Sequence, residues 1–168
     1  MPRTRVYTAF DGDTDIAYYR TLQMWSANSR IDFNLNDAHD LSYARDDSLP
    51  ESIINQLRIR LDASKSFILI VGEKTKTNRK GILKWEIGYA LRNKLPILLA
   101  FVGFDGTETN TAELWQNSLM PKIPTAIVDE EEKYCLVSPF TKTAIEHFIT
   151  TYTNNALPGK GNTWLWKR

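Results

Sequence analysis

The 168-residue sequence is poor in the residues that most often carry covalent or metal chemistry. It has one cysteine, Cys135, and two histidines, His39 and His147. A single cysteine excludes an internal disulfide framework and a cysteine-based zinc site, and a reducing cytosol is the simplest setting for it. His147 lies in the predicted final helix and Cys135 in a separate segment, and no G-x-S-x-G is present. A nucleophilic triad is therefore disfavoured.

Long apolar runs and an excess of charge are also missing. No run approaches the roughly 18 apolar residues of a membrane span, and the first ten residues lack the apolar core of a signal peptide. The formal charge is +1, which creates no global field for nucleic acid or an anionic membrane. The longest basic cluster, residues 73–84, is short and contains no aromatic residue. We expect a cytoplasmic protein with neither nucleic acid nor membrane as partner.

The residues that are present predict an alternating α/β chain. Hydrophobic residues make up 42% and charged residues 24% of the sequence, which is typical of a globular protein. Short apolar runs typical of strands covered on both faces alternate with segments of helical periodicity. The strand candidates are residues 6–10, 31–36, 66–72, 96–103 and 124–129. The helix candidates are residues 13–29, 48–64, 81–94, 111–119 and 138–155.

Strict alternation predicts a parallel sheet with helices on both faces. Five strands in about 150 residues suit a flavodoxin-like sheet of strand order 2-1-3-4-5. We predict one α/β domain over residues 1–154 and an extended C-terminal tail over residues 155–168. In that tail Trp164 and Trp166 alternate as on a strand, so they either pack on the domain surface or contact a partner.

A ligand site is expected where the strand order reverses, between the first and third strands of this sheet. The loop after the first strand is Phe10–Asp15, and the loop after the third is Gly72–Gly81. The next predicted helix begins directly after that second loop and carries one carboxylate, Glu86. At about 100° per residue, Glu86 lies about 60° from Leu83, at the edge of the apolar stripe. It is either a carboxylate directed at the site or a charge that favours the helix dipole.

The acidic loop after the first strand has several interpretations. Asp11, Asp13 and Asp15 alternate as in part of a calcium loop, but the later glycine and bidentate glutamate of that motif are absent. We favour turn and helix-cap roles, with Asp15 as an N-cap and Asp11 as the residue best placed to reach a ligand. Gly12 in this loop and Thr75 in the loop after the third strand are further candidate ligand contacts.

The long polar segment Asn36–Ser52 is expected over the same edge of the sheet. Loops of this length are commonly functional. Arg45 and Asp47 could contact a ligand or a neighbouring molecule, while capping of the next helix by Asp47 or Ser48 explains this stretch equally well. No G-x-G-x-x-G or Walker sequence is present, so a standard glycine loop does not cradle phosphates here.

Four stretches together resemble the TIR-like domains of the Thoeris antiphage-defence family. They are "VYTAFDGDTD", "SFILIVGEKT", "KWEIGYAL" and "LPILLAFV", and the resemblance covers roughly residues 5–102. For TIR enzymes it implies cleavage of the nicotinamide–ribose bond of NAD, with the catalytic glutamate at Glu86 and a cyclic or modified ADP-ribose as product. The family often has a tryptophan four residues before that glutamate, where this sequence has Ile82.

The implied reaction passes through an oxocarbenium-like state, as in glycoside cleavage. A carboxylate beside the ribose can offset the developing positive charge, and the cationic nicotinamide leaves without a general acid. The reaction needs no metal and no cofactor, because NAD is the substrate. Phe10 and Tyr7 are candidate wall residues, with Tyr7 expected in the core. The resemblance also implies a homo-oligomer and a phage-derived activator as partners.

Two other functions stay open at this point. A non-enzymatic TIR-like interaction module would use the loop Asn36–Ser52 and the tryptophans Trp85 or Trp164 as contacts. A nucleoside-processing transferase on a similar sheet would also place a glutamate near ribose, and would turn over free nucleosides rather than NAD.

Overall fold

The computed structural model describes residues 3–28, 30, 33–36, 51–78, 81–104 and 111–164. These residues form one six-stranded sheet, of order β2-β1-β3-β4-β5-β6, in which every neighbouring pair is parallel. The strands are β1 (Arg5–Ala9), β2 (Asn34–Asn36), β3 (Ser64–Val71), β4 (Ile97–Phe101), β5 (Tyr134–Pro139) and β6 (Gly161–Trp164). The predicted flavodoxin-like order 2-1-3-4-5 is confirmed, with a sixth strand added beside β5.

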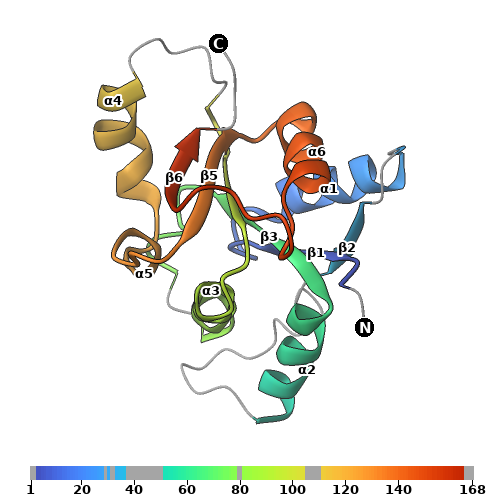
Figure 1. The fold of residues 1–168 in the computed structure, drawn as a ribbon. Helices are drawn as coiled ribbons and strands as arrows, with labels where there is room; N and C mark the ends of the chain where they lie inside the picture. The colour runs from blue at the N-terminus through green and yellow to red at the C-terminus, as the bar shows by residue number, and fades with distance from the viewer. Residues whose placement is uncertain are drawn as a thin grey trace.

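Helices cover both faces of this sheet (Figure 1). The longer ones are α1 (Ile16–Ala27), α2 (Glu51–Asp62), α3 (Gly81–Arg92) and α6 (Lys142–Thr151). Between β4 and β5 the described residues form four short turns of helix: α4 (Thr111–Leu114), the π-helical turn Trp115–Leu119, the 3₁₀ turn Met120–Lys122 and α5 (Thr125–Val128). Helices α1 and α6 pack on one face, and α2, α3 and α5 on the other (Figure 1).

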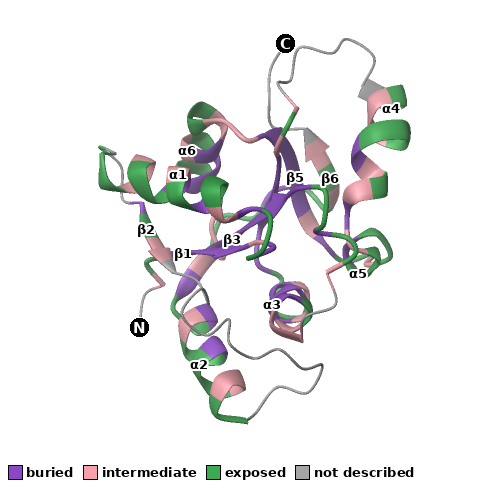
Figure 2. Cartoon of the chain, turned by 180° about the vertical axis from the view of Figure 1, so that it is seen from behind, coloured by how far each residue is buried: buried purple, intermediate pink, exposed green. Residues whose placement is uncertain are grey.

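The core lies on both sides of the sheet, because the side chains of a strand point alternately to its two faces. In β1, Tyr7 and Ala9 face α2 and α3, while Val6 faces α1 and α6. The central strands are mostly buried, as the purple in β1, β3 and β5 in Figure 2 shows; only Arg5, Lys65 and Tyr134, near the starts of these strands, are not. From Phe67 to Val71 every residue of β3 is 0% exposed, which explains why this strand reads as an unbroken apolar run.

The prediction of the fifth strand at residues 124–129 is wrong. Thr125–Val128 forms the short helix α5, which begins after Pro124 and buries only Ile127. The fifth strand is Tyr134–Pro139, paired in parallel with β4. Proline fixes its own φ at a value that suits the start of a helix, which favours α5 after Pro124. The helix is too short to show a helical period in the sequence, so its apolar residues indicate a strand instead.

Part of the predicted extended tail joins the sheet. Gly161–Trp164 is the edge strand β6, and the backbone N–H of Gly161 donates to the carbonyl oxygen of Lys133 at 2.8 Å. The side chain of Trp164 and all of Trp166 lie outside the described residues. Within the described part of the chain, no helix has the length and apolar content that a membrane span requires.

Candidate functional site

Glu86 belongs to the buried face of α3. Its side chain is only 3% exposed, although the sequence placed it at the edge of the apolar stripe. The other buried residues of the helix are Leu83, Ile87, Tyr89 and Ala90. A carboxylate costs free energy when it leaves water unless hydrogen bonds compensate, so its surroundings decide what it can do.

The partner of Glu86 comes from the first strand. The hydroxyl of Tyr7 donates a hydrogen bond to Oε1 of Glu86, with 2.5 Å between the two oxygens. Tyr7 is two residues from the end of β1, or about 7 Å at the rise of a strand. Glu86 is five residues from the start of α3, about 7.5 Å at the rise of a helix. The pair therefore lies just below the edge of the sheet where β1 and β3 end, at the predicted switch point.

Asp11, directly after β1, organises its own loop. Its Oδ1 accepts hydrogen bonds from the backbone N–H groups of Asp13 and Thr14, both at 3.0 Å, and from the Thr14 hydroxyl at 3.1 Å. Its Oδ2 accepts from the amide of Asn78 at 2.8 Å. Burial acts to raise the pKa of Asp11, but the hydrogen bonds from Asn78, Thr14 and Asp13 outweigh it and hold the pKa below its ordinary value. Asp11 thus joins the two loops at the switch point.

Asp15 occupies the N-cap position of α1 but makes no capping hydrogen bond, contrary to the prediction. Its carboxylate lies instead against Gly72 at the end of β3, where a Cβ atom would stand 2.4 Å from Oδ1. The side chain is 3% exposed, and Oδ2 has no hydrogen-bond partner among the described residues. Burial, together with the charge of Asp11, raises the pKa of Asp15 to about 6.

Thr75 holds the turn after β3. Its hydroxyl accepts from the backbone N–H of Gly72 at 2.8 Å and lies 3.3 Å from the carbonyl oxygen of Ile70. A cavity of about 100 Å³ opens beside it, between this turn, α3 and α5. Its lining residues are Thr75, Lys76, Asn78, Leu83, Lys84, Ile87, Pro124 and Ala126. Pockets for whole drug-sized ligands measure about 300–1,000 Å³, so this cavity would hold only a small part of a dinucleotide.

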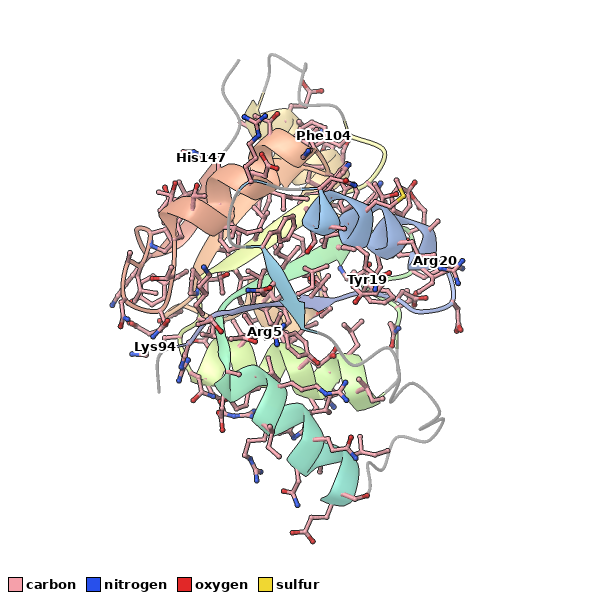
Figure 3. All side chains as sticks on the ribbon, turned by 90° about the vertical axis from the view of Figure 1, so that its right-hand side faces the viewer. Arg5, Tyr19, Arg20, Lys94, Phe104 and His147 are labelled. Carbon is pink, nitrogen blue, oxygen red and sulfur yellow. The ribbon has the colours of Figure 1, made fainter. Side chains whose placement is uncertain are left out.

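The remaining predicted contacts lie at the rim or outside the described residues. The half-buried ring of Phe10 stacks on Tyr19 of α1, with 4.6 Å between ring centroids, and Figure 3 shows Tyr19 on that blue helix. Gly12 is exposed, and a Cβ there would meet nothing within 4 Å. Arg45 and Asp47 lie outside the described residues.

Trp85, which the sequence left open as a partner contact, has a structural role. Its ring is half-buried, packs against the core below α3 and stacks on Tyr89 at 5.6 Å between centroids. Trp85 therefore extends the core rather than presenting an isolated surface ring.

Two groups of residues thus meet at the switch point. Asp11 and Asn78 tie the two loops together at the rim, and Tyr7 and Glu86 form a buried pair below them. Sequence reasoning missed Asn78 and the hydrogen bond of Tyr7. The only signal for Asn78 was its place in the loop after the third strand. Among the described residues, no three His, Cys, Asp or Glu side chains are grouped so that they could hold a metal ion.

A comparison with protein families agrees with this arrangement of strands and loops. Residues 7–107, more than half of the chain, match a family described as Thoeris protein ThsB, TIR-like domain. The match spans the end of β1, both switch-point loops, α3 and β4. No curated protein matches the chain.

Proposed function

Because the chain belongs to the family of Thoeris ThsB TIR-like domains, which are defence proteins, we propose that it cleaves the bond between nicotinamide and ribose in NAD. The observation that carries this proposal is the buried Glu86 carboxylate, held by Tyr7 just below the switch point of the sheet. Ligands of open α/β sheets bind at that edge. We infer that a ribose inserted between the two loops reaches this carboxylate.

The proposed chemistry needs one negative charge and no metal. The bond between C1′ of the ribose and the ring nitrogen breaks, and its electron pair neutralises the departing nicotinamide. The positive charge that develops on the ribose is offset by Glu86. C1′ then takes an electron pair from water, which releases a proton and gives ADP-ribose, or from an atom of the same molecule, which gives a cyclic ADP-ribose.

The rim residues would shape the opening rather than react. Both carboxylate oxygens of Asp11 accept hydrogen bonds within the protein, so its contribution is to fix the two loops. The ring of Phe10 and the exposed backbone at Gly12 are the parts of the first loop that a nucleotide could contact. Thr75 supports the second loop from below.

The test is nicotinamide release. Purified protein is incubated with NAD, alone and with lysate from phage-infected cells, and the products are separated by chromatography. We expect nicotinamide together with ADP-ribose or a cyclic isomer, and no turnover of free nucleosides. Turnover of nucleosides with NAD untouched would instead support a transferase, and intact NAD in both conditions would contradict the proposal.

One observation favours a non-enzymatic interaction module as the second candidate. With 3% of its side chain exposed and one oxygen bound by Tyr7, Glu86 is also well placed to be a purely structural polar residue. In that case Glu86→Gln would change stability but no product would form. Self-association measured by light scattering, without nucleotide turnover in either state, would support this candidate.

A further inference from the structure

The hydroxyl of Tyr7 has an unusual place for a polar group. Tyr7 lies within β1, between β2 and β3, and is 0% exposed. Its ring stacks on Phe67 of β3, with centroids 5.5 Å apart and planes 9° from parallel. The phenol is thus fixed by the sheet itself, and it crosses to α3 to reach a carboxylate 79 residues away in the sequence.

The bond between the two side chains has the length of a charge-assisted hydrogen bond. Pairs of hydroxyl donor and carboxylate acceptor are typically about 2.5–2.7 Å apart, and the Tyr7–Glu86 distance is 2.5 Å. The phenol is the donor of this bond and Oε1 of Glu86 is the acceptor.

A glutamate side chain without such a bond would sample several rotamers, and ordering it would cost conformational entropy when substrate binds. The rigid phenol removes that freedom in advance. Catalytic charges act most strongly when they are oriented before the reaction begins.

We propose that Tyr7 is a positioning residue: its hydroxyl holds the Glu86 carboxylate in one orientation for the oxocarbenium-like state. The inference rests on the proposed cleavage of NAD. Tyr7 itself touches no reacting atom. Its role predicts an effect on the rate of the chemical step and little effect on the binding of NAD.

The test compares Tyr7→Phe with the wild type. Phenylalanine keeps the ring and its stacking on Phe67 and removes only the hydroxyl. Charge-assisted hydrogen bonds contribute about 1.5–3 kcal/mol, and a loss of this size in the transition state lowers kcat roughly 10- to 160-fold. We expect that fall in kcat per folded molecule, with KM changed less than twofold. The control is Tyr152→Phe, whose ring lies beside Phe148 on the opposite face of the sheet.

A spectroscopic measurement keeps the inference testable if Tyr7→Phe folds poorly. In Glu86→Gln the phenol of Tyr7 loses its charged acceptor, so the near-ultraviolet tyrosine absorption should differ from that of the wild type. Superimposable spectra, or a kcat of Tyr7→Phe within twofold of an active wild type, would overturn the role of Tyr7 alone. A wild type that leaves NAD intact would overturn the proposed function and this inference with it.

Discussion

Replacing Gly72 with alanine tests whether the carboxylate of Asp15 really packs against the end of β3. A Cβ atom at Gly72 would lie 2.4 Å from Oδ1, 2.5 Å from Oδ2 and 2.7 Å from Cγ of Asp15. Ordinary contacts begin at 3.4 Å, so the carboxylate would have to retreat by the difference between 3.4 and 2.4 Å, or 1.0 Å. Asp15 is only 3% exposed, so little open space is available for this movement.

The expected cost follows from this overlap. Extra methyl groups in a well-packed region destabilise proteins by about 1–3 kcal/mol. The backbone of Gly72 is outside the positive-φ region that favours glycine, so the cost arises from the contact with Asp15. We therefore expect Gly72→Ala to lower the free energy of unfolding by about 1–3 kcal/mol.

Urea unfolding at neutral pH measures this change through the midpoint, provided that the slope stays constant. Gly159→Ala is the matched control, since a Cβ at Gly159 meets nothing within 4 Å, and it should stay within about 0.5 kcal/mol of the wild type. In an Asp15→Ala background the cost of Gly72→Ala should largely disappear. Equal midpoints for Gly72→Ala and the wild type would refute this account of the switch point.

Two further predictions concern the same turn. The pKa of Asp15 is raised from 3.8 to about 6 by burial and by the charge of Asp11, so the folded state binds the proton more tightly than the unfolded state. The protonated Asp15 contributes about 3 kcal/mol of stability below pH 4, and this contribution is lost as the pH rises through 6. In urea unfolding across that range, the stability of Asp15→Asn should not show this fall. A pH dependence equal to that of the wild type would contradict the raised pKa of Asp15. Thr75→Val leaves the backbone N–H of Gly72 without its acceptor. In thermal melts it should lower the free energy of unfolding by about 1–3 kcal/mol, whereas Thr75→Ser, which keeps the hydroxyl, should not. Equal losses in both variants would argue against the role of the Thr75 hydroxyl.

The strands with a clear burial signal could be predicted from the sequence. β3 and β4 are covered on both faces and read as continuous apolar runs, so their places and their neighbours in the sheet follow from the pattern. Tyr134–Pro139 was missed although it contains five consecutive buried residues, Cys135 to Pro139. Its apolar run is short and lies between a charged turn and Ser138, while the neighbouring Pro124–Asp129 has a similar composition.

Only the topology of the site, meaning which loops and which helix meet there, could be predicted from the sequence. Alternation of strands and helices placed the loops after β1 and β3 together, and periodicity brought Glu86 to the edge of the core. The specific partners depend on contacts that no local pattern contains. The bond from Asn78 to Asp11 spans 67 residues and that from Tyr7 to Glu86 spans 79. Asp15 looked like a helix cap because the sequence does not reveal that Gly72 leaves room for its carboxylate.

The most direct test of the proposed function is the rate of nicotinamide release by Glu86→Gln. Glutamine keeps the size of the side chain and can still accept a hydrogen bond from Tyr7, but it carries no negative charge. Removing one group that stabilises a transition-state charge typically lowers kcat about 10²- to 10³-fold. The exposed Glu131 of the turn before β5 provides the matched control, Glu131→Gln.

Both variants and the wild type are assayed with NAD at equal concentrations of folded protein, under the condition in which the wild type is active. We expect Glu86→Gln to lose at least about 100-fold in nicotinamide release and Glu131→Gln to keep the wild-type rate. Equal rates in Glu86→Gln and the wild type would remove Glu86 from the reaction and contradict its proposed catalytic role.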